Sequence, residues 1–302
     1  MSTAIQTYFL APPKNLPAPI PTIDVIETCP NILSKTGGRK VVCVGDHFVV
    51  KFGTSVEALE GQTMLYIRDT TSVTLPKVYA LFTDNNTTKT YIVMERIRGP
   101  TLLSQWPKLS RTQKGQIAAQ IKRNIDQLRD LPSPGYFGSY GRQALRDTIF
   151  WTGLDTPVSI SGPFDSQEQL NNGLVLQYIM VADGNPRLEQ RARFYKRALS
   201  AVFYNHHPTF THGDLQRKNI MLIEKTAQDG PISRSSDNEN QDYDVVIIDW
   251  ETSGWYPEYW EYCSASWGIR WDDDWDEWLE QIVRPYFVEY SWVKMFRDEL
   301  WS

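Results

Sequence analysis

Hydrophobic and polar positions follow one pattern in the first third of the chain and another in the rest, which predicts two structural parts. Residues 41–53 contain two apolar runs around Gly45-Asp46, a pair that favours a tight turn, so they predict a β-hairpin. Residues 73–82 and 90–97 are two further apolar runs, and turn-forming residues separate them. They predict a second hairpin.

One helix is predicted between these hairpins. Thr54 and Glu57 have the spacing of a capping box, in which side chains satisfy the free N–H groups at a helix start. Apolar residues follow at the helical period as far as Ile67. Residues 1–22 are rich in proline and predict an extended arm. We therefore expect residues 1–98 to form a small antiparallel sheet with one helix, preceded by this arm.

Helical periodicity dominates after Gly99-Pro100. Ser110 and Gln113 predict another capping box, and an apolar stripe follows until Pro132, which a helix does not tolerate in its interior. The other elements expected here are helices at 166–180, at 188–204 and in the last fifty residues, and strands at 220–223 and 244–250.

The polar stretch 225–243 between those two strands has the composition of a flexible surface loop, which we expect to be poorly ordered. The whole pattern predicts an α+β protein. A small antiparallel sheet region with one helix, residues 1–98, precedes a larger and mainly helical region, residues 99–302.

Composition and charge narrow the classes of protein that this chain can be. The sequence has 302 residues, of which 41% are hydrophobic and 22% charged, a balance typical of globular proteins. A net charge of −5 argues against a nucleic-acid binder, which needs clustered basic residues. The three cysteines lack C-x-x-C spacing and suggest neither disulfides nor zinc. Without a secretory leader or a membrane-length apolar run, we expect a cytoplasmic protein that does not bind membranes.

The strongest chemical signal is the segment HGDLQRKN at 212–219, followed by Asp249 at the end of an aliphatic run. Phosphoryl transfer needs a carboxylate that orients and deprotonates the attacking hydroxyl, and oxygen ligands that hold Mg²⁺ on the phosphates. Asp214 suits the first role, and Asn219 and Asp249 offer hard oxygen atoms for the second. Either element alone is common in ordinary turns, but both in this order predict a phosphotransferase.

These residues resemble the signature of the aminoglycoside phosphotransferase and choline kinase-like family, which shares the protein-kinase fold. That signature is H-G-D-x-x-x-x-N, then a few apolar residues and I-D; this chain reads HGDLQRKN and IIDWE. The run from Trp250 to Tyr262 is similar to the fungal branch, and the resemblance extends from about residue 30 to the end. It implies a bilobal protein-kinase-like fold, with an N-lobe at 1–98 and a C-lobe at 99–302.

Lys51 is the candidate ligand of the nucleotide phosphates. In the kinase pattern, a strand lysine contacts the α- and β-phosphates and is held by a helix carboxylate. Lys51 stands among apolar residues on a predicted strand, although lysines are also common on edge strands. Its expected partner is Glu60, which lies towards the apolar helix face, whereas Glu57 is assigned to the capping box. The resemblance agrees with this choice.

Two more segments are candidates for nucleotide contact. The resemblance implies that residues 90–99 join the lobes, with Met94 at the back of the pocket and backbone groups of Glu95 and Ile97 bonding the base. From the residues alone, this segment is a strand followed by a turn. The chain has no G-x-G-x-x-G, so Gly37 and Gly38 are the glycines that could close over phosphates.

Departures from the protein-kinase pattern favour a small-molecule acceptor. Gln216 stands where protein kinases have a lysine, there is no A-P-E element, and the chain after Asp249 leaves no room for an activation segment. A protein kinase is therefore disfavoured.

The resemblance places the acceptor site in the region of residues 267–278, where the family uses acidic groups to bind ammonium substrates. Asp272, Asp273 and Asp276, together with Trp255, are the candidate acceptor residues, and the substrate would carry an amine near its hydroxyl. The alternative is a solvated amphipathic helix on which Trp271, Trp275 and Trp278 share one face.

The sequence thus predicts a kinase that uses ATP or GTP with Mg²⁺ to phosphorylate a hydroxyl of a small molecule. A catalytically silent kinase-fold protein that binds a nucleotide or metabolite is the alternative. It is disfavoured because a pure binder has no need of Asp214 as a base. Neither the identity of the acceptor nor the oligomeric state follows from the sequence.

Overall fold

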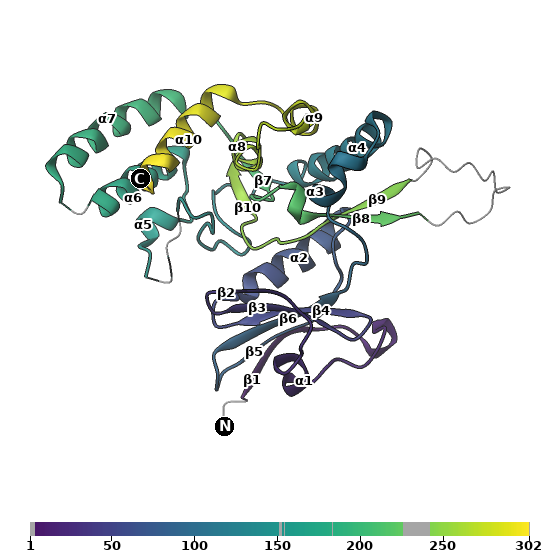
Figure 1. The fold of residues 1–302 in the computed structure, drawn as a ribbon. Coiled ribbons are helices and arrows are strands. Elements are labelled where there is room, and N and C mark those ends of the chain that lie inside the picture. Colours follow the sequence, from purple (N-terminus) through teal and green to yellow (C-terminus); the bar gives the residue numbers. More distant parts are fainter. Residues whose placement is uncertain (1–3, 151–152, 154, 183, 226–241, 302) are drawn as a thin grey trace.

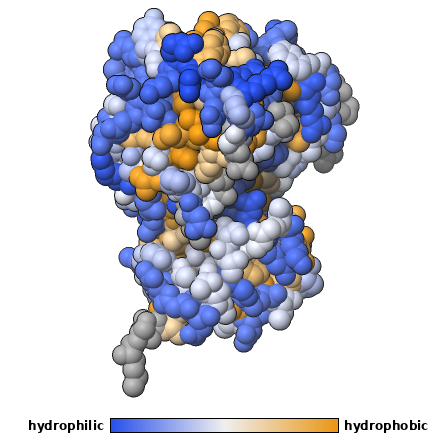
Figure 2. Space-filling view, turned by 90° about the vertical axis from the view of Figure 1, so that its left-hand side faces the viewer, coloured by the Kyte–Doolittle hydropathy of each residue, from blue (hydrophilic) through white to orange (hydrophobic). Residues whose placement is uncertain are grey.

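The computed structural model describes residues 4–150, 153, 155–182, 184–225 and 242–301. A β-sheet part that contains the N-terminal residues adjoins a helix-rich part, and α2 lies between them (Figure 1). In space-filling view the molecule narrows between the two parts (Figure 2). Within the described ranges, no helix combines the length and apolarity that crossing a bilayer requires.

The first part is built on an antiparallel six-stranded sheet with the strand order β1-β5-β6-β4-β3-β2. Its strands are β1 (Ile5–Leu10), β2 (Ile32–Thr36), β3 (Arg39–Val44), β4 (Phe48–Gly53), β5 (Val78–Asp84) and β6 (Lys89–Glu95), and its helices are α1 (Ile23–Glu27) and α2 (Ala58–Thr70). β3 pairs with β4, and β5 with β6, so both predicted hairpins are confirmed.

The proline-rich arm is more structured than predicted. Strand β1 pairs with β5 at the edge of the sheet, and the 3-10 turn η1 (Pro13–Asn15) follows it. Helix α1 then packs against the outer face of the sheet. β1 lacks the apolar alternation that reveals a half-buried strand, because most of its side chains are exposed. Backbone pairing with β5 therefore decides its conformation. Ile26 of α1 is fully buried in a small core on this outer face of the sheet.

The helix after β4 begins later than its sequence suggested. α2 starts at Ala58 with Glu57 as the N-cap residue, and no side chain caps it, so the capping box from Thr54 to Glu57 is wrong. The carboxylate of Glu57 instead accepts two hydrogen bonds from Arg146, at 2.6 and 3.0 Å. A tertiary ion pair has thus replaced the local cap.

The two faces of the sheet belong to different cores because side chains alternate along β5 and β6. Leu81 and Ile92 point to the large core, which they share with Met64 and Ile67 of α2. Their neighbours, such as Val93, point to the small outer core. α2 is therefore fixed between the sheet and the helix-rich part, which sets the position of every side chain on its buried face.

The second part is mainly helical and contains two small strand pairs, β7 with β10 and β8 with β9. Its helices are α3 (Leu102–Gln105), η2 (Trp106–Lys108), α4 (Arg111–Arg129), α5 (Val158–Ser161), α6 (Gln167–Ala182), α7 (Pro186–Val202), η3 (Arg217–Asn219), α8 (Trp260–Ser266), α9 (Trp275–Ile282) and α10 (Phe287–Leu300). Its strands are β7 (Pro208–Thr211), β8 (Ile220–Glu224), β9 (Tyr243–Ile247) and β10 (Gly254–Pro257). The predicted α+β class is confirmed.

Helix α4 follows its sequence prediction closely. Ser110 and Gln113 form the expected capping box, with both reciprocal hydrogen bonds present. The predicted apolar stripe, which includes Ile117, Ile121 and Ile125, is buried in the large core. The predicted loop at 225–243 lies mostly outside the described residues.

The aromatic segment near the C-terminus differs from the prediction. Helix α9 begins at Trp275, whereas Trp271 precedes it with a φ of 60° and is 72% exposed. Trp275 and Trp278 are buried, and both rings meet the Trp106 ring edge-on. Asp274 accepts hydrogen bonds from the indoles of Trp106 and Trp278 and thereby fixes the start of the helix. The prediction that all three tryptophans share one helix face is therefore wrong.

Candidate active site

The loop that follows β7 carries Asp214, and buried groups hold its backbone. Gly213 has a φ of 84°, and a Cβ there would lie 2.9 Å from Oγ1 of Thr252, so only glycine suits this turn. Glu261 of α8 accepts the backbone N–H of His212 at 2.6 Å and that of Gly213 at 3.3 Å. A buried carboxylate thus fixes the two residues that precede Asp214.

His212 connects the Asp214 loop to the chain before Asp249 through both nitrogens of its ring. Its Nδ1 accepts the N–H of Asp214 at 3.2 Å, so the proton is assigned to Nε2, which donates to the carbonyl of Ile248 at 3.1 Å. Complete burial lowers the pKa of His212, partly opposed by the charge of Asp214. A neutral imidazole therefore ties the Asp214 loop to the segment that ends in Asp249.

The side chain of Asp214 is oriented by three donors from its own loop. Oδ1 accepts from Nε2 of Gln216 at 2.6 Å. Oδ2 accepts from Nδ2 of Asn219 at 2.7 Å and from Nζ of Lys218 at 2.9 Å. The side chain is 24% exposed, so a ligand hydroxyl can reach it. This geometry suits a carboxylate that accepts a proton from a bound molecule.

Asn219 and Asp249 lie side by side because β8 and β9 are paired. Ile220 stands opposite Ile247, and the N–H of Ile248 donates to the carbonyl of Asn219 at 2.9 Å. Asp249 then adopts a φ of 66°, a conformation that Asp tolerates better than most residues. The turn directs its carboxylate towards Lys51, 2.9 Å away.

These side chains also suit a hard cation. The amide of Asn219 donates through Nδ2 to Asp214, which leaves its Oδ1 as a potential ligand beside the carboxylate of Asp249. Mg²⁺ prefers such oxygen donors and is commonly held by few protein ligands. The described part of the chain contains no group of three or more His, Cys, Asp or Glu arranged to hold a metal by itself. The donor set therefore fits a cation that arrives with ligand oxygens of its own.

Lys51 is the centre of a buried charge cluster. Its Nζ lies 2.7 Å from Glu60, 2.9 Å from Asp249 and 2.8 Å from Glu251, and the residue is only 5% exposed. Burial lowers the pKa of Lys51, but the three carboxylates outweigh it and raise the pKa, so the ammonium stays charged. The partner expected from the helix face, Glu60, is the one that the fold supplies.

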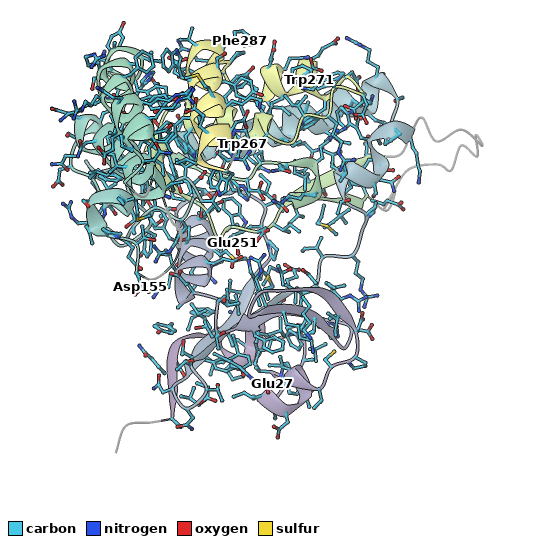
Figure 3. All side chains as sticks on the ribbon, turned by 60° about the vertical axis from the view of Figure 1, so that its left-hand side comes forward. Glu27, Asp155, Glu251, Trp267, Trp271 and Phe287 are labelled. Atoms are coloured by element: carbon cyan, nitrogen blue, oxygen red, sulfur yellow. The ribbon has the colours of Figure 1, made fainter. Side chains whose placement is uncertain are left out.

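The cluster has three carboxylates but only two cations, Lys51 and Arg39. Burial raises the pKa of Glu60 to about 7, with Lys51 opposing the shift. Glu251 also bonds Arg39, the first residue of β3, and it lies between the two parts of the molecule (Figure 3). Sequence reasoning missed Glu251 and Arg39. The only local signal for Glu251 was its position two residues after Asp249.

A cavity of about 260 Å³ opens beside this cluster. The three hinge candidates Met94, Glu95 and Ile97 line it, as do Lys51, Glu60, Asn219 and Asp249. The N–H of Glu95 donates to the carbonyl of Lys77 at 2.8 Å, so Glu95 cannot use it to contact a base. Its carbonyl and the backbone of Ile97 are the remaining candidates.

The glycine turn lies next to this cavity without lining it. Gly37 and Gly38 connect β2 to β3, and their neighbours Ser34 and Arg39 form part of the wall. The carbonyl of Gly38 would lie 1.9 Å from a Cβ at Gly53, so the turn is packed closely on the end of β4. Any contact of the turn with phosphates therefore depends on its backbone or on Arg39.

The candidate acceptor residues are not gathered around that cavity. Trp255 is 4% exposed and packs against Phe210 and Tyr66, so it is a core side chain and does not offer a surface to a ligand. Asp273 pairs with Arg217 at 2.7 Å. Asp272 is exposed and Asp276 half-buried, and none of the three aspartates lines the 260 Å³ cavity.

Glu261 is a further residue that sequence reasoning passed over. It stands between Trp260 and Tyr262, and a carboxylate in such an aromatic run is the signal that could have found it. Burial raises the pKa of Glu261 to about 7, opposed by its hydrogen bonds to the backbone of His212 and Gly213.

No family model matches the chain, and no curated protein matches it either. Solved structures do. The ADP-bound aminoglycoside phosphotransferase APH(2'')-Ib is 15% identical with a TM-score of 0.53, and the match covers 89% of this chain and 79% of that one. The gentamicin complex of APH(2'')-IIa is 14% identical with a TM-score of 0.53, covering 89% and 78%. The streptomycin–ATP complex of APH(2'')-IIa is 15% identical with a TM-score of 0.51, covering 77% and 69%.

At such low identity these matches show a shared fold. The sheet part and the mainly helical part have the protein-kinase-like architecture of aminoglycoside phosphotransferases.

Proposed function

We propose that this chain is a phosphotransferase that moves the γ-phosphate of ATP or GTP to a hydroxyl group of a small molecule. One observation carries the proposal. Asp214 is hydrogen-bonded to Asn219, and Asn219 lines one cavity together with Asp249 and Lys51, which bond each other. This is the set of groups that phosphoryl transfer requires, and the fold shared with ATP- and ADP-bound aminoglycoside phosphotransferases supports it.

In the proposed reaction, Asp214 orients the acceptor hydroxyl and accepts its proton. The acceptor oxygen forms a bond to the γ-phosphorus while the bond from phosphorus to the β–γ bridging oxygen breaks, and the nucleoside diphosphate leaves. Lys51 contacts the phosphates and stays positioned by Glu60. Asn219 and Asp249 would hold Mg²⁺, which would supply charge neutralisation at the phosphates. The base would lie against Met94, with Glu95 and Ile97 at its edge.

Glu251 has a defined place in this proposal. In the structure it bonds both Lys51 and Arg39, the cations nearest to the proposed phosphate site. Phosphate oxygens would compete for the same donors, so nucleotide binding would displace Glu251. The turn of Gly37 and Gly38, which leads into β3 at Arg39, would then lie over the phosphates.

We further propose membership of the aminoglycoside phosphotransferase and choline kinase-like family, in its fungal branch. The proposed lobes are residues 1–98 and 99–302, and the proposed setting is the cytoplasm. The HGDLQRKN and IIDWE segments support the family. Only a short connection separates β9 from β10, which supports a small-molecule acceptor over a protein substrate.

The test is a transfer assay with purified protein, Mg²⁺, ATP or GTP, and a panel of hydroxylated metabolites read by mass spectrometry. A gain in mass of one phosphate on an acceptor, lost in Asp214→Asn, supports the proposal. Calorimetry of ATP binding is measured alongside the transfer assay. If the protein binds ATP yet transfers phosphate to nothing and hydrolyses nothing, it is a catalytically silent nucleotide binder.

A further inference from the structure

A second cavity, of about 240 Å³, lies beside the Asp214 loop. Gln216, Arg217 and Lys218 form one wall, and residues 267–270, between α8 and α9, form another. Gln216 and Lys218 are the side chains that bond Oδ1 and Oδ2 of Asp214, at 2.6 and 2.9 Å. The cavity therefore begins one side chain away from the proposed base.

The two walls are in direct contact at Gly268. A Cβ at this glycine would lie 3.0 Å from Cγ of Gln216, so the segment packs tightly on the Asp214 loop. Leu103, Trp267 and Ile269 add apolar surface to the lining. The cavity thus combines an apolar wall, suited to a carbon skeleton, with polar groups that reach Asp214.

The charged side chains of this cavity are all cationic: Arg217, Lys218 and Arg270. Arg217 is 4% exposed, pairs with Asp273 at 2.7 Å and lies over the rings of Trp106 and Trp275, so its charge is compensated. Lys218 is paired with Asp214. Arg270 is exposed, and within the described ranges it has no ion-pair or hydrogen-bond partner. The lining therefore carries an uncompensated positive charge.

None of the aspartates at 272–276 lines this cavity, and two of them are already paired. Asp273 is engaged by Arg217, and Asp274 is engaged by Lys114 at 2.7 Å and by the indole of Trp106 at 3.0 Å. These carboxylates hold the wall together. A cation near the cavity would meet the unpaired charge of Arg270, whereas an anion would be attracted to it.

We propose that this cavity is the acceptor site and that the acceptor is a small hydroxylated molecule carrying a carboxylate or a phosphate. Arg270 binds the anionic group, the apolar wall holds the carbon skeleton, and the hydroxyl faces Asp214. When Asp214 turns to that hydroxyl, Lys218 becomes available as a second cation for the anionic group. The inference rests on the proposed function, since it names the substrate class of the same site. It replaces the amine-bearing acceptor expected from the acidic cluster.

The test compares acceptors that share a carbon skeleton and differ in charge. Glucose, gluconate, glucose 6-phosphate and glucosamine are assayed for phosphate transfer at fixed ATP and Mg²⁺, so carboxylate and phosphate are separate arms. We expect kcat/KM to be highest for an anionic member. Arg270→Gln should raise KM for that acceptor about tenfold, the loss expected for one charge-assisted hydrogen bond, while KM for ATP stays unchanged. Arg270→Lys should restore part of the affinity.

Arg187→Gln, at an exposed arginine near the start of α7, is the matched control and should behave as the parent protein. A preference for glucosamine, or an equal effect of Arg270→Gln on charged and neutral acceptors, overturns the inference. If the protein does not bind ATP, the proposed function is wrong, and the acceptor inference that rests on it falls with it. If ATP binds but no panel member is phosphorylated, calorimetry with gluconate and glucose 6-phosphate on the ADP-saturated protein decides. Binding that Arg270→Gln weakens supports the site, and no binding, or binding unaffected by Arg270→Gln, refutes it.

Discussion

Replacing Glu261 by Gln should change how the stability of this protein depends on pH. Glu261 is fully buried in α8 and accepts the backbone N–H groups of His212 and Gly213. Burial raises its pKa from 4.5 to about 7, in spite of those hydrogen bonds. In the unfolded chain the same carboxyl should ionise near 4.5.

The direction in which stability changes with pH follows from the protons that the folded and unfolded states bind. Between pH 4.5 and about 7 the folded protein holds a proton on Glu261 that the unfolded chain has lost, so stability falls as pH rises through this window. A rise of the pKa from 4.5 to about 7 corresponds to roughly 3 kcal/mol, because each pH unit is worth about 1.36 kcal/mol. Part of the window lies below pH 5, so raising the pH from 5 to 8 should cost roughly 2 to 3 kcal/mol through this group.

Glu261→Gln cannot ionise and should lose this dependence. Unfolding by guanidinium chloride, followed by tryptophan fluorescence at pH 5, 6, 7 and 8, gives the free energy of unfolding of both proteins. The difference, variant minus parent, should grow by roughly 2 to 3 kcal/mol from pH 5 to pH 8. Glu60, whose pKa is also raised, is present in both proteins and cancels.

Glu277→Gln, at an exposed carboxylate of α9, controls for the loss of one surface charge. Any constant cost of replacing a hydrogen-bonding carboxylate by an amide drops out of the comparison across pH. Parallel curves for parent and Glu261→Gln would refute the reasoning, because they would mean that burial does not hold the proton on this carboxyl.

Three substitutions test the proposed chemistry. Asp214→Asn should reduce phosphate transfer by ~10²–10⁴, the range for loss of a general base, with calorimetric nucleotide affinity nearly unchanged; an equal loss of both would indicate a structural role. Asp249→Ala should abolish the Mg²⁺ dependence of ATP binding, and an unaltered dependence would contradict the metal assignment. Glu251→Gln should strengthen metal-free ATP binding by roughly three- to tenfold, since Lys51 and Arg39 lose a competing carboxylate; weaker binding in EDTA would contradict the displacement of Glu251.

Local patterns in the sequence determined much of the fold. The hairpin around Gly45 and the helix that begins after Ser110 were predictable because turn and cap residues satisfy their backbone groups within a few positions. Lys51 and Glu60 were predictable as a pair for a related reason. A strand and the helix that follows it face one another when the connection is short, so their buried faces meet.

Contacts between distant segments decided the rest. Arg39 and Glu251 are 212 positions apart, and the local sequence around either residue does not indicate that they pair. They meet only when the two parts of the molecule come together. Trp255 and Trp271 are both tryptophans in aromatic-rich segments, yet Trp255 is buried in the core and Trp271 is exposed. Burial depends on which segments pack around a side chain. The pairing of Asp273 with Arg217 is another contact that only the tertiary structure shows. A carboxylate attracts cations from solution only while no buried arginine neutralises it, and Arg217 does so here.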